Sequence, residues 1–510
     1  MEDYRTALKL LDQNYFMSTI DIKDAYFLIA INEGDRKKLR FRWRSQLYEF
    51  NVLPFGLCTA PFVFTKLLKP VLEYLRTAGF LSVNYLDDFL CLSESYSECL
   101  LNVKTTCNFL KSLGFIINTK KSVMVPSQMC KFLGFMFNTT DMTITLPSEK
   151  KNKIKSRIIE IMGKNKCSIR YFAEFVGLLT AACPAVSYGW MYTKLFEREK
   201  FLCLGYSNNY NKQMKLGKNL ESDLLWWRDN IDTSYAPIRK NNDYIFEIFT
   251  DASSTGWGAA CGDKSASGNW TETELALHIN ELELKAVYYG LKIFSANLRE
   301  CNILLRIDNT TAIAYVNRMG GVQHPHLNEL ARNIWQWCET RNIFIFASYI
   351  RSQDNVIADR ESRRVNIDTE WEISDQAFLV IVKSLGEPEF DLFASVQNYK
   401  CSRYASWKLD PYSEIVDSFT FNWNTVYFYA FPPFCLITRV LEKIKSDKAT
   451  GIVVIPYWPS QAWYPLWSKL VISEKIFLGP NRSLLYSPFR TCHPLHVSLI
   501  LVAAKLSGNP

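Results

Sequence analysis

Two adjacent aspartates, Asp87 and Asp88, lie inside the apolar, β-prone segment 83–89. Neighbouring side chains of a strand point to opposite faces, so a pair at a strand tip or in a hairpin turn can direct carboxylate oxygens into a shared cation site. Burying such charges without a partner would be very costly. The alternative interpretation is a solvated turn in which both aspartates are turn formers.

A third aspartate, Asp21, lies upstream in a second apolar strand pattern, residues 19–27. Between the two patterns, a loop rich in Pro and Gly at 53–61 opens an apolar helix over residues 62–75. Two acid-bearing strands around one helix predict a single cation site. Carboxylate oxygens suit Mg²⁺, and a pair of such ions promotes in-line displacement at phosphorus.

A second group of acids begins near residue 245. The pattern predicts a strand over 245–251, a helix over 279–294 with apolar residues at three- and four-residue spacing, and a strand over 303–307. These elements and a short helix after residue 355 carry four acids, which are Asp251, Glu283, Asp308 and Asp359. Individually, Asp308 could belong to a turn, and Glu283 could be a solvated helix position beside Glu281.

Taken in this order, the motifs resemble a reverse transcriptase followed by a ribonuclease H. The resemblance implies that Asp21 and Asp87 bind metal directly and that Asp88 supplies a supporting charge within the same catalytic metal site. It also implies two Mg²⁺ or Mn²⁺ ions in each active site. In the second site the implied metal ligands are Asp251, Glu283, Asp308 and Asp359. Many such nucleases place a histidine before the last acid, but residues 348–353 contain none.

The same resemblance implies roles for residues around the first site. Tyr26 matches the bulky position that crowds a ribose 2′-hydroxyl, which favours deoxynucleotides. Phe55 and Gly56 match the loop that packs against the nucleotide and template, and Lys121 matches a lysine near the departing pyrophosphate. The hairpin that grips the primer end would contain Phe132, Leu133 and Gly134.

The segment 149–170 is strongly basic, within a chain whose formal charge is +8. Ile154, Ile158 and Ile161 form an apolar stripe, so the pattern predicts one amphipathic basic helix. In a polymerase this helix would follow the phosphates of a primer–template duplex through Lys150, Lys151 and Lys155. A solvated helix face remains the alternative.

The tail resembles the adenine-N6 methyltransferase-like segment that follows ribonuclease H in DIRS-type retrotransposons. Pro432 and Pro433 lie between a strand pattern and a helix, and a further strand is expected over 451–456. In active relatives an Asn or Asp precedes the two prolines, but here the residue is Phe431. We therefore expect a catalytically inactive tail that is structural or binds nucleic acid.

At 510 residues and 48% apolar content, the chain is long enough for several cores. We predict a multidomain protein of mixed α+β and α/β class. Its parts are expected to be a palm with partial fingers (1–145), a mostly helical thumb or connection (146–242), a ribonuclease H-like domain (243–366) and an α/β tail (370–510). The basic, strand-like run 36–44 would be the surviving half of the fingers, because only twenty residues precede Asp21.

These observations predict an RNA-directed DNA polymerase with ribonuclease H activity from a retrotransposon polyprotein. The expected partners are an RNA template, a DNA primer, an RNA–DNA hybrid and deoxynucleoside triphosphates. The scattered cysteines and the lack of a signal peptide or membrane-spanning run favour a cytoplasmic or nuclear protein without a membrane partner. The alternative is a truncated, polymerase-deficient relic that acts as a ribonuclease H or only binds nucleic acid.

Overall fold

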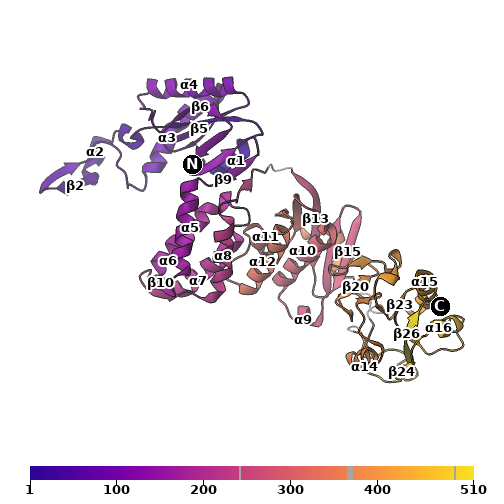
Figure 1. The fold of residues 1–510 in the computed structure, drawn as a ribbon. Helices are drawn as coiled ribbons and strands as arrows, with labels where there is room; N and C mark the ends of the chain where they lie inside the picture. Colours follow the sequence, from indigo (N-terminus) through magenta and orange to yellow (C-terminus); the bar gives the residue numbers. More distant parts are fainter. Residues whose placement is uncertain (240–242, 365–370, 488–489, 510) are drawn as a thin grey trace. The chain divides into compact units, whose positions relative to one another are not determined.

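The computed structural model describes residues 1–239, 243–364, 371–487 and 490–509. The chain divides into two compact units, Met1–Asp243 and Tyr244–Pro510 (Figure 1). Both units combine sheets with packed helices, so the mixed α/β, multidomain fold class predicted from the sequence is confirmed. Across these described ranges, no helix is both long enough and apolar enough to span a bilayer.

A four-stranded antiparallel sheet carries the first group of acids. Its strands in spatial order are β4 (Leu81–Tyr85), β5 (Asp88–Ser93), β1 (Phe16–Asp21) and β6 (Val123–Ser127). Two helices, α3 (Ala60–Thr77) and α4 (Tyr96–Ser112), bury their apolar faces against this sheet. The strand predicted over 19–27 is too long, because β1 ends at Asp21 and residues 25–28 form a 3₁₀ turn.

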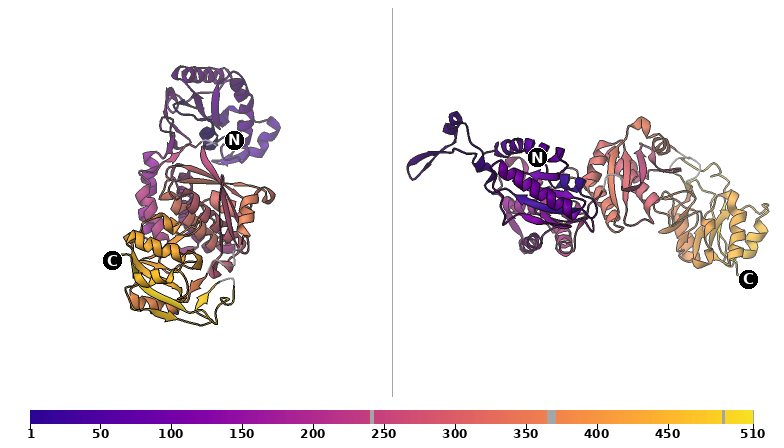
Figure 2. Two further views of the ribbon diagram at one scale, coloured as in Figure 1. Left: turned by 90° about the vertical axis from the view of Figure 1, so that its right-hand side faces the viewer. Right: turned by 90° about the horizontal axis from the view of Figure 1, so that it is seen from above.

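An isolated hairpin of β2 (Arg40–Trp43) and β3 (Gln46–Glu49) extends away from this sheet (Figure 2). Every residue of the two strands is exposed. The strand-like run predicted over 36–44 is wrong in its first part, since Arg36 ends the helix α2 (Glu33–Arg36). The Asn32 side chain accepts a hydrogen bond from the Gly34 N–H and so begins that helix.

The single helix predicted over 149–170 is also wrong. Helix α5 (Ser148–Met162) ends at Gly163, and the Ser168 hydroxyl caps a separate helix. Between the helices, residues 166–168 pair with residues 213–215. The remaining elements of this unit are α1 (Tyr4–Leu10), β7 (Met129–Phe132), β8 (Phe135–Asn138), β9 (Thr143–Thr145), β10 (Lys166–Ser168), α6 (Ile169–Ala182), α7 (Lys194–Leu204), β11 (Gln213–Lys215), α8 (Glu221–Asn230) and β12 (Ala236–Pro237).

A five-stranded sheet in the second unit carries the second group of acids. Its strands in spatial order are β15 (Lys264–Asn269), β14 (Gly256–Cys261), β13 (Tyr244–Ala252), β16 (Asn302–Ile307) and β17 (Phe344–Tyr349). The first three strands are antiparallel, and β13, β16 and β17 are parallel. The helices of this part are α9 (Glu272–Leu275), α10 (Ile279–Ser295), α11 (Thr310–Asn317), α12 (Pro325–Glu339) and α13 (Val356–Ser362).

The tail contains a seven-stranded sheet in which the first five strands are parallel and β26 is antiparallel to both neighbours. The spatial order is β21 (Ile415–Val416), β20 (Arg403–Ser406), β19 (Phe390–Asp391), β22 (Phe428–Ala430), β23 (Thr450–Pro456), β26 (Leu501–Ser507) and β24 (Ile476–Leu478). The other elements are β18 (Glu372–Ile373), α14 (Asp375–Leu385), α15 (Ile437–Asp447), α16 (Tyr464–Leu470) and β25 (Leu485–Tyr486).

Candidate active sites

Asp21, Asp87 and Asp88 meet at one end of the first sheet. Asp21 is the last residue of β1 and pairs directly with Asp88, the first residue of β5. Asp87 lies in the turn between β4 and β5, where Leu86 adopts a positive φ of 55°. The Ile22 N–H donates to the Asp87 carbonyl oxygen at 2.9 Å, which ties this turn to the end of β1.

These carboxyl groups disfavour one another's charged forms. Burial, Asp87 and Asp21 raise the pKa of Asp88 to about 6, while Lys121 opposes this shift. Burial also raises the pKa of Asp87, and Asp21 adds to the effect. Such a group of half-buried acids would gain most from a cation, which removes the mutual repulsion.

Tyr26 and Phe55 pack against each other beside these acids, with ring centroids 5.2 Å apart. Burial and, to a smaller extent, the Asp87 charge raise the pKa of Tyr26. Gly56 has a positive φ of 87°, a conformation that L side chains rarely adopt. Lys121 lies in the turn after Asn118, and its charge acts on both Asp87 and Asp88.

Phe132, Leu133 and Gly134 lie in a tight hairpin between β7 and β8. Leu133 and Gly134 both have positive φ, as a two-residue turn with right-handed strand twist requires. A Cβ on Gly134 would lie 2.3 Å from the Lys150 Nζ, so this lysine packs directly over the hairpin. Lys150 also lies 5.2 Å from the Phe135 ring centroid, and burial lowers its pKa.

Lys151 and Lys155 contact Asp232 on the same unit. The Lys151 Nζ donates to the Asp232 carbonyl oxygen at 2.6 Å, and Lys155 forms an ion pair with the Asp232 carboxylate. Both contacts are solvent-exposed, and exposed ion pairs contribute only about 0–1 kcal/mol. A stronger anion such as a phosphate could therefore displace them.

The second group of acids converges more closely. Oxygens of Asp251, Glu283 and Asp308 lie within 4.8 Å of one another, the spacing expected of three ligands to one ion. They come from β13, from α10 and from the residue after β16. In the part of the chain that the structure describes, no other His, Cys, Asp or Glu group, including Asp21, Asp87 and Asp88, meets this spacing.

The fourth acid, Asp359, is held differently. Its Oδ1 accepts hydrogen bonds from the Arg363 Nη2 at 2.6 Å and Nε at 3.0 Å, one turn further along α13. The Asp359 charge nevertheless contributes to raising the pKa of Asp251, after burial and Asp308. Asp359 is therefore paired with Arg363 and does not belong to the group of acids that lie within 4.8 Å of one another.

Glu283 fits a hard cation. Its side chain is 4% exposed, and its Oε2 has no hydrogen-bond partner. Burial and the charges of Asp251 and Asp308 raise the pKa of Glu283 to about 9. A buried oxygen without a partner is costly, and a divalent ion bound by carboxylates would satisfy it.

We expect stability in EDTA to depend on pH through Glu283. Because folding raises this pKa from 4.5 to about 9, the favourable contribution is complete below pH 4.5 and is lost as the pH rises through 9. Between pH 6 and 9 the apparent melting temperature should fall for the wild type and fall less for Glu283→Gln. Added Mg²⁺ should restore the melting temperature of the wild type but not that of Glu283→Gln. Parallel pH curves for the two proteins would contradict this assignment.

Three polar residues that the sequence pattern does not single out support the cluster. The Ser362 Oγ donates to the Asp251 Oδ2 at 2.6 Å, and the Ser352 Oγ donates to the Asp308 Oδ2 at 2.7 Å. The Asn355 amide donates to the Thr250 carbonyl oxygen at 3.0 Å. Ser352 belongs to the loop 348–353, which contains no histidine. These contacts orient two of the three converging acids.

Gly258 allows α13 to reach the cluster. A Cβ at this position would lie 2.1 Å from the Ala358 carbonyl oxygen and 2.5 Å from the Ser362 nitrogen. A Cβ on Gly290 of α10 would instead contact Ala259, the next residue of the strand. Because neighbouring strand residues face opposite sides, α10 and α13 cover opposite faces of the sheet.

Comparison with known proteins identifies the first part of the chain. Residues 1–137 match the family described as reverse transcriptase (RNA-dependent DNA polymerase). The chain is 27% identical over 392 residues to the enzymatic polyprotein of Cauliflower mosaic virus strain D/H, covering 70% of this chain and 52% of the polyprotein. It is 32% identical over 370 residues to the transposon Tf2-3 polyprotein of Schizosaccharomyces pombe, covering 68% and 25%.

The chain thus spans about half the length of the viral polyproteins that it matches. Among solved structures, a foamy viral protease-reverse transcriptase in complex with an RNA/DNA hybrid has a TM-score of 0.41 and 19% identity, covering 72% of this chain and 49% of the other. Residues 1–137 thus match the reverse transcriptase family, and the chain is similar to viral and transposon polyproteins. At this level the resemblance stated from the motifs is confirmed.

Proposed function

We propose that this chain is an RNA-directed DNA polymerase with ribonuclease H activity, from a retrotransposon most like the DIRS-type elements. The family match supports the polymerase, and the convergence of Asp251, Glu283 and Asp308 within 4.8 Å is the observation that carries the nuclease. Both activities transfer a phosphoryl group. Bound Mg²⁺ or Mn²⁺ would activate the attacking oxygen and neutralise the leaving oxygen in each site.

In the proposed polymerase site, Asp21 and Asp87 hold the metal and Asp88 supplies negative charge. Tyr26 excludes a ribose 2′-hydroxyl, and the Phe55–Gly56 loop packs against the incoming nucleotide. Lys121, whose charge already acts on Asp87 and Asp88, neutralises the departing pyrophosphate. Proximity and fixed charges of this kind supply much of the barrier reduction in phosphoryl transfer.

The hairpin that contains Phe132, Leu133 and Gly134 is proposed to hold the primer end, with Lys150 over it. The side of α5 that bears Lys151 and Lys155 would contact duplex phosphates, in competition with Asp232. We assign these duplex contacts to α5, which ends at Met162.

In the proposed nuclease site, three converging carboxylates position the metal, and Asp359 completes the set if it leaves Arg363. Ser362 and Ser352 hold Asp251 and Asp308 in place. We keep the four proposed domains, 1–145, 146–242, 243–366 and 370–510, as functional parts within the two compact units. The tail is proposed to be inactive in methyl transfer, because Phe431 offers no acceptor for an adenine amine.

A primer-extension assay on an RNA template tests this proposal directly. With Mg²⁺ and deoxynucleoside triphosphates, the full chain should extend a labelled DNA primer and fragment the template within the hybrid. Replacing deoxynucleotides by ribonucleotides should suppress extension but leave fragmentation of a preformed hybrid. If the chain binds the hybrid but neither extends nor cuts in Mg²⁺ or Mn²⁺, the non-catalytic relic is the correct description.

A further inference from the structure

A loop of the tail completes a hydrophobic core of the five-stranded sheet. This contact loop comprises residues 407–412 and follows β20. Its Leu409 packs against a cluster of buried side chains that lie mostly in β14, β15 and α10. The cluster consists of Ala252, Trp257, Ala259, Ala266, Trp270, Leu282, Ala286 and Tyr289. A side chain of the tail therefore packs into the part of the fold that carries the second group of acids.

The contact loop also holds α10 through a tyrosine. The Lys292 Nζ on α10 lies 3.7 Å from the centroid of the Tyr412 ring and 4.6 Å from that of the Tyr288 ring. The Tyr412 ring meets the Tyr289 ring edge to face, with centroids 5.8 Å apart. An ammonium group between two aromatic faces is attracted by both. Because one of these rings belongs to α10 and the other to the tail, the lysine joins the two.

The Asp410 carboxylate fixes the shape of the contact loop. Its Oδ1 accepts hydrogen bonds from the Tyr404 hydroxyl at 2.8 Å and from the Tyr412 N–H at 2.9 Å. Its Oδ2 accepts from the Val396 N–H at 2.8 Å. The Asp410 charge also acts on Lys292 across the contact. Tyr412 is thus held in position by the tail itself, which reduces the conformational entropy lost in the contact with α10.

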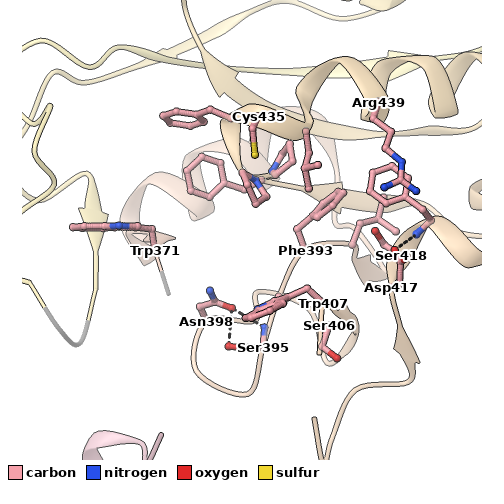
Figure 3. Close-up of a pocket in the computed structure, with 18 of the residues that line it drawn as sticks. Trp371, Phe393, Ser395, Asn398, Ser406, Trp407, Asp417, Ser418, Cys435 and Arg439 are labelled. Atoms are coloured by element: carbon pink, nitrogen blue, oxygen red, sulfur yellow. Dashed lines mark hydrogen bonds between the residues drawn. The ribbon is translucent and has the colours of Figure 1, made fainter. Parts of the chain in front are cut away.

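A second loop of the tail reaches the edge strand β15. The Gln397 Nε2 donates to the Asn269 carbonyl oxygen at 2.6 Å. Gln397 belongs to a turn in which the Ser395 N–H donates to the Asn398 Oδ1 at 2.7 Å (Figure 3). Two separate loops of the tail therefore contact the five-stranded sheet.

The contact loop also lies beside α13. Three of its residues line a small cavity of about 130 Å³ together with β15, with Glu361 of α13 and with the nearby Arg364. Between these two positions, the Ser362 hydroxyl donates to the Asp251 carboxylate. Because α10 carries Glu283, the loop adjoins both helices that bring side chains to the converging acids.

We propose, on the basis of the proposed nuclease function, that the tail positions the cluster of Asp251, Glu283 and Asp308 through the contact loop. This role requires no methyl transfer. Loss of the contact would let α10 and α13 move relative to the sheet. Since catalytic groups must be held within about 0.5 Å of the productive geometry, such movement would slow cleavage without removing any metal ligand.

The test uses the full chain with Tyr412→Ala, Lys292→Met and the double variant. Tyr412 is 46% exposed and belongs to neither buried cluster of the tail, so its replacement should leave the tail folded. Phe477→Ala is the matched control, because Phe477 is an exposed aromatic on β24, at the opposite edge of the tail sheet. Amide hydrogen exchange in α10 and α13 is measured without metal or substrate. Single-turnover cleavage of an RNA–DNA hybrid is measured with Mg²⁺ over a range of protein concentrations.

Tyr412→Ala should speed amide exchange in α10 and α13 about tenfold, the effect of losing one partly desolvated cation–π contact. The maximal cleavage rate should fall by about the same factor, while the affinity for the hybrid should stay unchanged. The double variant should resemble the two single variants, since all three remove the same contact. Phe477→Ala should behave like the wild type in both measurements.

Wild-type exchange in Tyr412→Ala, or additive effects in the double variant, would overturn the proposal. So would a loss of cleavage in Phe477→Ala equal to that in Tyr412→Ala. Absence of cleavage by the wild type, together with faster exchange in Tyr412→Ala, would refute the nuclease function but support the positioning of the acids by the contact loop.

Discussion

Asp308→Asn is expected to reduce cleavage of an RNA–DNA hybrid by roughly 100-fold or more. Replacing a residue that only supports a metal ligand already lowers metal affinity or activity by about 10–100-fold. The substitution keeps the size of the side chain and its contact with Ser352 while removing one of three converging charges. Single-turnover cleavage of a labelled hybrid by the full chain in Mg²⁺ measures the loss. Binding of the hybrid should persist.

Asp263→Asn provides the matched control for this prediction. Asp263 is exposed in the turn between β14 and β15 and belongs to the same five-stranded sheet. The Asp263→Asn variant should cleave the hybrid at the wild-type rate. Equal rates for Asp308→Asn and the wild type would show that the acid cluster is not the nuclease site.

Asp87→Asn is expected to reduce the rate of primer extension by about 100-fold or more, without lowering the affinity for the duplex. The carboxylate lies in the β4–β5 turn, whereas the proposed duplex contacts lie on α5 and the β7–β8 hairpin. Extension of a DNA primer on an RNA template gives the rate, and an anisotropy titration with the same primer–template gives the affinity. Hybrid cleavage should be retained.

Glu73→Gln on α3 is the corresponding control, as an exposed acid of the same unit changed to its amide. The Glu73→Gln variant should extend the primer at the wild-type rate. A parallel loss of extension and duplex affinity in Asp87→Asn would indicate a folding defect, and undiminished extension would exclude Asp87 as a metal ligand.

Much of the secondary structure around the acids could be predicted because the pattern there is local. The strand before Asp251, the helix that carries Glu283 and the turn at Asp87 all follow from apolar spacing and turn residues. The prediction of one continuous helix over 149–170 was wrong. It relied on the basic residues and disregarded Gly163, which follows the end of α5, and Ser168, which caps α6.

The support of the nuclease cluster could not be predicted in the same way. Ser362 and Asp251 are 111 residues apart, and nothing near either residue indicates their hydrogen bond. The contact depends on the close approach of α13 to β14 at Gly258, a tertiary feature. The pairing of Asp359 with Arg363 has a local signal, the four-residue spacing on a helix, which favours an ion pair as readily as a metal ligand.

The ion pair between Lys155 and Asp232 changes how the affinity for a duplex is expected to depend on salt concentration. Each phosphate neutralised by a lysine normally releases condensed cations and steepens the dependence of affinity on salt, by about −0.9 in logarithmic slope. When Lys155 binds a phosphate, it must leave the Asp232 carboxylate. That carboxylate then attracts cations from the solution. The cations bound in this way offset part of the cation release from the duplex. The measured slope would count fewer phosphates than α5 touches, and this chain would hold its duplex with less sensitivity to ionic strength than its +8 charge suggests.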